Sequence, residues 1–128
     1  MFEMVALMLL SQQPLVPVAE GVASYYTVRS SSRLTASGEK FSDEAFTCAM
    51  MRGEFGKFYL VVSEEGDSVV CRLNDRGPYV KGRVIDLSKA AIRQLHPKAG
   101  MIRVKVYELG KNLLNPLVMA FRESKPAQ

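Results

Sequence analysis

Residues 74–78 (Asn-Asp-Arg-Gly-Pro) constrain the fold most, because they end one strand pattern and lead almost directly into another. An apolar strand pattern precedes them at residues 68–73, and a second short strand is predicted at residues 83–87. Asn and Asp tolerate unusual backbone angles, Gly supplies positive φ, and Pro fixes its own φ. Asp75 is therefore expected at a rigid strand end, either capping the turn or open to a ligand.

The composition fits a single domain that can fold without structural metals or disulfide bonds. A chain of 128 residues, of which 48% are hydrophobic, can build a core without metals or disulfides. Its net charge of +4 favours an anionic partner without identifying one. There is no recognition-helix pattern and no Gly-and-aromatic motif of an RNA-binding sheet, so nucleic acid is not expected as a partner.

The two cysteines do not form a metal-binding pattern. Cys48 and Cys71 make no Cys-x-x-Cys pair, and the chain has one histidine, so a structural zinc site is not expected. Both cysteines lie within apolar runs and are predicted to be buried thiols. A single disulfide is the alternative, and sequence does not decide between the two.

The amino-terminal part of the chain differs from the rest. The apolar run at residues 4–10 is far too short to span a bilayer, but it could be the core of a secretory signal. Glu3 stands where a positive charge is usual. No cysteine comes directly after the run, so no lipoprotein attachment site is expected. We interpret residues 1–20 as a signal-like or linker segment, 21–110 as the folded domain, and 111–128 as a tail.

Short strands account for most of the predicted domain. β-Branched, aromatic or alternating residues predict strands at residues 21–28, 46–51, 58–62, 68–73, 83–87 and 101–109. Residues 64–67 are expected to form a hairpin turn. Because strands and helices do not alternate regularly, a parallel layered sheet is not expected. A small closed β-barrel with one inserted helix hides its strand edges and is the predicted architecture.

One convincing helix is predicted at residues 88–95. Ser88 can cap it, and its apolar residues fall on one face. His96 precedes Pro97, which ends the helix, so His96 is interpreted as a helix-end residue rather than a catalyst. Ser42 is expected to start a single helical turn.

Four motifs occur in order over most of the chain: Gly21-x-Ala23-Ser24-x-Tyr26, Thr35-Ala36-Ser37-Gly38-Glu39-x-Phe41, Asn74-Asp75-Arg76-Gly77-Pro78 and Arg83-x-Ile85-Asp86-Leu87-Ser88. Together they resemble the rare lipoprotein A family, the septal-ring lytic transglycosylases. The resemblance implies an all-β fold, a six-stranded double-psi β-barrel with one inserted short helix. That fold is similar to the fold of expansins.

The resemblance also implies an activity. The family cleaves the β-1,4 bond between N-acetylmuramic acid and N-acetylglucosamine in peptide-stripped glycan strands of peptidoglycan. The C6 hydroxyl of the muramic acid attacks the anomeric carbon and leaves a 1,6-anhydro end. Such a reaction needs a proton for the leaving oxygen and a base for the hydroxyl, and one carboxyl group can serve in turn. Peptidoglycan as partner, a periplasmic or cell-wall location, no cofactor, no metal and a monomeric state are the accompanying expectations.

The resemblance assigns roles to individual residues. Asp75 matches the family's catalytic Asp and is expected to be the acid/base. Glu39 matches a Glu of the same site and would orient or charge-balance the sugar. Met50 stands where the family has an active-site His, and methionine cannot shuttle a proton. Met50 is expected among the substrate-binding residues. Asp86 is expected to be structural, with its carboxylate bonding loop amides.

Four further residues complete the predicted substrate site. Arg76, Tyr79 and Arg83 could hold the sugar or its lactyl carboxylate, because Arg binds carboxylates with two donors. For both arginines the alternative is to brace the loop through backbone carbonyls. Tyr26 could stack on a sugar ring, as could Tyr25, although strand alternation turns one of the two into the barrel. The alternative for the whole domain is an expansin-like module that binds glycan without cutting it.

Overall fold

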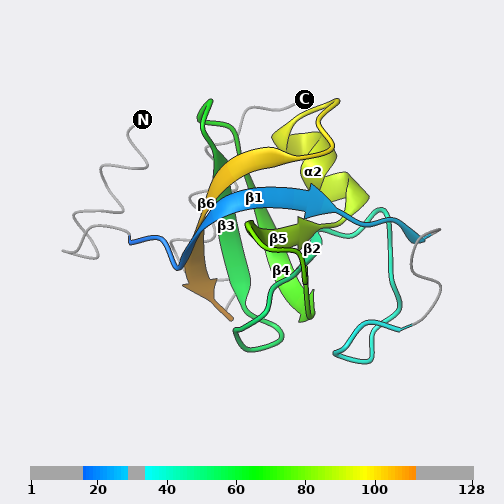
Figure 1. Ribbon diagram of the computed structural model, residues 1–128. Coiled ribbons are helices and arrows are strands. Elements are labelled where there is room, and N and C mark those ends of the chain that lie inside the picture. Colours follow the sequence, from blue (N-terminus) through cyan, green and yellow to red (C-terminus); the bar gives the residue numbers. More distant parts are fainter. Residues whose placement is uncertain (1–15, 29–33, 112–128) are drawn as a thin grey trace.

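Six strands close into one barrel in the computed structural model, which describes residues 16–28 and 34–111 (Figure 1). Around the barrel the order is β1-β5-β2-β4-β3-β6. The elements are β1 (Ala19–Tyr25), β2 (Thr47–Ala49), β3 (Phe58–Ser63), β4 (Ser68–Asp75), β5 (Arg83–Leu87), the helix α2 (Lys89–Leu95) and β6 (Ile102–Gly110). The predicted closed barrel with one late helix is confirmed. The signal-like run and most of the tail lie outside the described residues.

The barrel mixes parallel and antiparallel pairs. β1 runs parallel to β5, and β2 runs parallel to β4, whereas the other neighbours are antiparallel. β3 and β4 form the hairpin predicted around residues 64–67. In this arrangement the carboxyl end of β4 and the strands β2 and β5 lie side by side, which brings together residues far apart in the sequence.

Alternation along the strands builds the core. In β6, Val104 and Val106 are buried whereas Arg103 and Lys105 are exposed, as the sequence pattern predicted. Residues from all six strands and from α2 meet in one hydrophobic core, including Ala23, Cys48, Val61, Leu73, Ile85, Leu87, Ile92 and Val106. Burying these side chains is the main favourable contribution to folding.

Most strand boundaries differ from the prediction by one to three residues, and β5 is the strand whose predicted bounds agree at both ends. β1 begins at Ala19 rather than at residue 21, because Ala19 and Glu20 pair with β6. β2 comprises three residues, so the predicted strand at 46–51 is too long. The helical turn predicted at Ser42 is wrong. The Ser42 hydroxyl does accept the amides of Glu44 and Ala45, as a helix cap would, but the chain only bends there before it enters β2.

Helix α2 is capped as predicted. Ser88 accepts the amide of Ala91 on its Oγ at 3.2 Å, and the same hydroxyl donates to the Ala45 carbonyl at 2.6 Å. At the other end His96 donates its amide to the Ile92 carbonyl, and its Nδ1 accepts two amides of the following turn. The imidazole therefore supports the helix end, in agreement with its predicted role.

The cysteines are two buried free thiols, as predicted. Cys48 on β2 and Cys71 on β4 both point into the core, where their sulfur atoms form a hydrogen bond of 2.8 Å. Burial raises the pKa of the Cys48 thiol. The pair therefore acts as part of the apolar core.

Replacing Ser88 with Ala should destabilise the protein. The variant loses the helix cap and leaves the Ala45 carbonyl without its donor, so the free energy of unfolding should fall by about 2 kcal/mol. Urea unfolding followed by circular dichroism measures this. Lys89→Ala, at an exposed position of the same helix, is the control and should stay within about 0.5 kcal/mol of the wild type. A Ser88→Ala variant as stable as that control would contradict the capping role.

Candidate active site

A β-bulge at the end of β4 decides where Asp75 points. Cys48 pairs with Leu73, but the next residue of β2, Ala49, pairs with Asp75, so Asn74 is the extra residue. Directly paired residues project from the same face of a sheet. The bulge therefore places Asp75 on the outer face of the barrel beside Ala49, whereas a regular register would turn it toward the interior.

A second carboxyl group lies on the same line. Ala49 pairs with Asp86 of β5 as well as with Asp75, and Asp86 pairs in turn with Ser24 of β1. Ser24, Asp86, Ala49 and Asp75 thus form a row across four neighbouring strands, called the carboxylate row below. The residue before each of the first three is in the core, so the side chains of the row lie on the other side of the strands, where Ser24 and Ala49 are buried and the two aspartates are half-buried.

Asp75 is held at the surface by the loop that precedes β2. Its Oδ1 accepts the amide of Ala36 at 2.8 Å and the amide of Arg76 at 2.9 Å. The side chain is half-buried, and within residues 16–28 and 34–111 its Oδ2 has no hydrogen-bond partner. Two amides therefore orient the carboxyl group while one oxygen stays available to a ligand.

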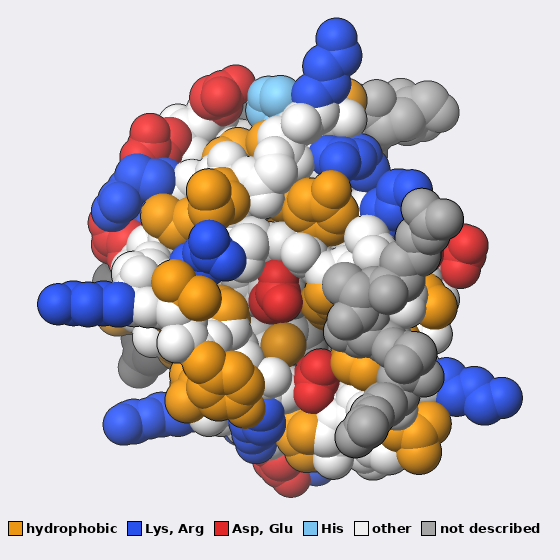
Figure 2. Space-filling model, turned by 45° about the vertical axis from the view of Figure 1, so that its right-hand side comes forward, with side chains coloured by type: hydrophobic (Ala, Val, Ile, Leu, Met, Phe, Trp, Pro, Cys, Tyr) orange, Lys and Arg blue, Asp and Glu red, His pale blue; other side chains and the backbone are white. Residues whose placement is uncertain are grey.

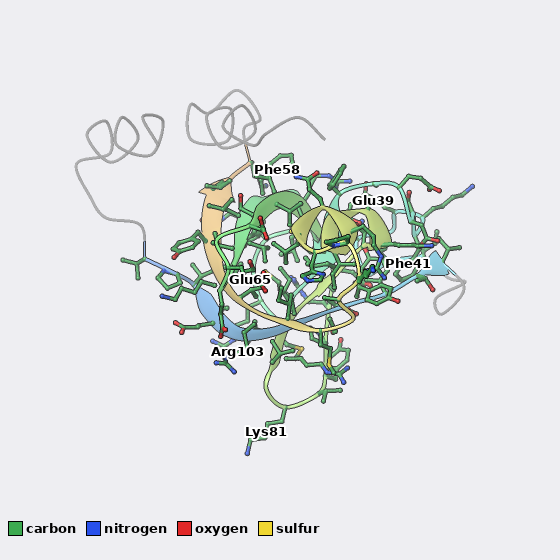
Figure 3. All side chains as sticks on the ribbon, turned by 90° about the horizontal axis from the view of Figure 1, so that it is seen from above. Glu39, Phe41, Phe58, Glu65, Lys81 and Arg103 are labelled. Carbon is green, nitrogen blue, oxygen red and sulfur yellow. The ribbon has the colours of Figure 1, made fainter. Side chains whose placement is uncertain are left out.

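Glu39 is bound to an arginine on the neighbouring outer surface of β4. Its two carboxylate oxygens accept the two Nη atoms of Arg72, at 2.7 and 2.8 Å. This hydrogen bonding lowers the pKa of Glu39, so the group stays ionised over the neutral range. Figure 3 labels Glu39 and Phe41 in the segment between β1 and β2. Glu39 thus contributes a fixed negative charge near the site, and its carboxylate is occupied by Arg72.

Tyr26 supports the row from beside it. The side chain is 7% exposed, its hydroxyl lies 2.7 Å from that of Thr47, and its ring meets Phe41 edge-on at 5.4 Å. Burial raises the pKa of Tyr26, and the nearby charge of Asp75 adds to the effect. Tyr25 packs against the core under Arg93. Neither ring therefore lies open for stacking on a sugar in this structure.

Arg76 braces a loop through backbone carbonyls, and Met50 packs in the hydrophobic core. Arg76 donates through Nη2 to the Gly53 carbonyl at 2.7 Å, and its guanidinium lies 4.2 Å from the centroid of the Phe55 ring. Nη1 also reaches the carbonyl of Met50 at 3.5 Å. The side chain of Met50 is 7% exposed and belongs to the core. Arg76 therefore fixes the loop after β2 against the end of β4, as its bracing alternative predicted.

The loop between β4 and β5 carries the remaining predicted residues. Gly77 adopts a φ of 128°, which fits the predicted need for a glycine in the turn. Tyr79, two residues further, is 75% exposed and free to meet a ligand. Figure 3 shows this loop projecting from the barrel, with Lys81 at its tip. Arg83, at the start of β5, is half-buried and lies close enough to Asp86 to lower the pKa of that group.

Asp86 has an environment that the sequence did not predict. Burial raises its pKa; the hydrogen bond from Ser24 and the charge of Arg83 oppose this, and the charge of Asp75 adds to it. Its hydrogen-bond donor among the described residues is the Ser24 hydroxyl, at 3.2 Å. The bonds to loop amides expected for Asp86 are not formed with the described part of the chain.

One face of the molecule has acidic side chains near its centre. Figure 2 shows acidic side chains between hydrophobic ones in the middle of the face, whereas most lysines and arginines stand toward its margin.

Within the described ranges, no three or more His, Cys, Asp or Glu side chains are grouped so as to hold a metal ion. In the same ranges, α2 falls well short of the length and apolarity that a membrane-crossing helix needs.

Comparisons with known proteins identify this barrel. Residues 18–106 match the family model described as lytic transglycolase. The chain is 36% identical over 96 residues to a Pasteurella multocida protein named endolytic peptidoglycan transglycosylase RlpA. It is 42% identical over 99 residues to a Treponema pallidum protein named probable endolytic peptidoglycan transglycosylase RlpA. These alignments cover 72% and 76% of this chain, but 33% and 31% of the relatives, so the chain spans about a third of their length.

A solved structure supports the fold. The crystal structure of the apo-expansin from Clavibacter michiganensis aligns with a TM-score of 0.52 and 22% identity, over 70% of this chain and 49% of that one. With the barrel topology, this neighbour confirms the double-psi β-barrel that the resemblance implied. The family match, the relatives and the barrel agree, and the chain therefore belongs to the lytic transglycolase family, with RlpA transglycosylases as its relatives.

Proposed function

We propose that this chain is an endolytic lytic transglycosylase of peptidoglycan. It would cleave the β-1,4 bond between N-acetylmuramic acid and N-acetylglucosamine in peptide-stripped strands, leaving 1,6-anhydro ends. The observation that carries the proposal is Asp75, which a bulge turns outward and two amides orient, in a barrel of this family. The names of the relatives supply the substrate class.

The reaction requires two proton transfers. The leaving oxygen of N-acetylglucosamine must gain a proton, and the C6 hydroxyl of the muramic acid must lose one as it attacks the anomeric carbon. A carboxyl group at position 75, with Oδ2 available, can exchange a proton with the sugar. Because the proton gained from the hydroxyl replaces the proton given to the leaving group, the enzyme ends the cycle unchanged.

The other predicted site residues support Asp75 at a distance or from the rim. Glu39 and Arg72 hold the loop whose Ala36 amide binds Asp75, and they add a fixed pair of charges. Tyr79 is an exposed aromatic side chain on the β4–β5 loop, four residues after Asp75 in the sequence. We assign it to glycan contact, since exposed aromatic rings pack well on the apolar faces of sugars.

The same proposal places the protein outside the cytoplasm, in the periplasm or cell wall, and names peptidoglycan glycan strands as its partner. The supporting observation is the substrate class of the relatives, because peptidoglycan is assembled outside the cytoplasmic membrane. The apolar run at residues 4–10 is compatible with a secretory signal.

Asp75→Asn should abolish product formation without unfolding the barrel. Asn keeps an oxygen for the amides of Ala36 and Arg76 but cannot exchange the proton, so release of anhydro-glycans should fall at least about 100-fold. Mass spectrometry of products from peptide-free strands measures the change. Glu65→Gln is the matched control and should behave like the wild type. Glu65, labelled in Figure 3, lies in the β3–β4 hairpin, at the opposite end of β4 from Asp75.

The outcome separates the proposal from its alternative. Release by Asp75→Asn at the wild-type rate would reject the assignment of Asp75. A wild-type protein that sediments with purified sacculi, yet yields no soluble product over long incubation, would support the non-catalytic glycan-binding module instead.

Met50→Leu should leave the reaction unchanged. Because the side chain of Met50 packs in the core, a volume-conserving substitution should alter the free energy of unfolding by less than about 1.5 kcal/mol. Urea unfolding and the glycan-release assay measure both quantities. A folded Met50→Leu variant that loses release would show that Met50 contacts the substrate, as its place in the predicted binding set implies.

A further inference from the structure

Two carboxyl groups, not one, flank the centre of the carboxylate row. We propose that Asp86 is a second catalytic residue, which gives its proton to the leaving oxygen while Asp75 takes the proton of the C6 hydroxyl. This inference rests on the proposed function and divides its two proton transfers between two residues.

The strand register supports this division. Asp75 and Asp86 are each the direct partner of Ala49, from opposite sides, so two strand spacings of about 4.8 Å separate their Cα atoms. Enzymes that cleave glycosidic bonds with two carboxyl groups hold those groups roughly 5–9.5 Å apart. The Cα spacing of Asp75 and Asp86 is of this order, and the charge of Asp75 reaches the Asp86 carboxyl group. The side chain between them is the methyl group of Ala49, which is 2% exposed, so β2 itself places no larger side chain between the two carboxyl groups.

The environment of Asp86 suits a proton donor. Burial and the charge of Asp75 both raise its pKa, and the Ser24 hydroxyl and Arg83 hold part of this rise back. A like charge nearby disfavours the ionised form of a carboxyl group, and the charge of Asp75 acts on Asp86 in this way. These are the groups known to face Asp86 from β1, β4 and β5.

A purely structural role explains Asp86 poorly. A half-buried carboxylate that holds a fold together is ordinarily met by several donors. Asp86 receives one hydrogen bond among the described residues, from a neutral hydroxyl at 3.2 Å, and forms no ion pair within 4 Å there. The group is placed beside the reacting centre without the contacts that would make it a brace.

The other candidate donors are engaged elsewhere. Glu39 is bound by Arg72, which lowers its pKa. Position 50 holds a methionine, and the Nδ1 of His96 accepts two amides at the end of α2. Asp86 is therefore the group in the described part of the chain that combines a place in the row with a raised pKa.

The proton balance of the division is simple. Asp86 transfers its proton to the O4 of N-acetylglucosamine as the glycosidic bond breaks. The C6 oxygen of the muramic acid bonds to the anomeric carbon, and its proton passes to Asp75. Asp75 then loses that proton to solvent and Asp86 regains one, so no co-reactant is needed.

The test combines rates with their pH dependence. Asp86→Asn should lower anhydro-glycan release at least about 100-fold, while sacculus binding and the circular dichroism spectrum stay as in the wild type. Ser24→Ala gives a readout that a structural role would not move. It removes a hydrogen bond that lowers the pKa of Asp86, so the protonated form of Asp86 should persist to higher pH. The fall of kcat on the alkaline side should therefore begin at a higher pH than in the wild type.

Ser42→Ala is the matched control, because Ser42 lies outside the row, and its pH profile should coincide with that of the wild type. The inference is overturned if Asp86→Asn releases product at the wild-type rate. It is also overturned if Ser24→Ala leaves the alkaline limb in place. An active wild type with either result rejects this inference alone, whereas an inactive wild type rejects the proposed function and the inference together.

Discussion

The bulge at Asn74 determines the site, because it selects the face of the barrel on which Asp75 stands. One extra residue in β4 changes the partner of Ala49 from position 74 to position 75. The amide of Ala36 then binds the half-buried carboxyl group of Asp75 and fixes the loop between β1 and β2 against the end of β4. Arg76 fixes the loop after β2 in the same way. The geometry of the site thus follows from one irregularity in strand pairing.

The fold was largely predictable because its signals are local. The valines of residues 101–109 alternate with charged residues, the Gly and Pro of residues 74–78 mark the turn, and Ser88 marks the helix start. Each of these patterns acts within a few residues. The four motifs added the topology, which local patterns do not determine.

The arrangement of the site was less predictable because it depends on contacts between distant segments. The pairing of Ala49 with both Asp75 and Asp86 joins residues 26 and 37 positions apart, and one step of register would separate them. The ion pair of Glu39 with Arg72, and the covering of Tyr26 by Phe41, depend equally on how a long loop folds back. The alternation along residues 83–87 did contain one signal, since it turns Asp86 outward between buried Ile85 and Leu87.

The bulge also leaves a cost in the interior. Asn74 is 3% exposed, and its Oδ1 has no hydrogen-bond partner among the described residues. An unpaired buried acceptor of this kind costs about 1–3 kcal/mol. Selection for heat resistance alone would favour replacing this side chain or straightening the strand, and a straightened strand would withdraw Asp75 from the surface. Position 74 is therefore where selection for durability and selection for turnover should act in opposite directions.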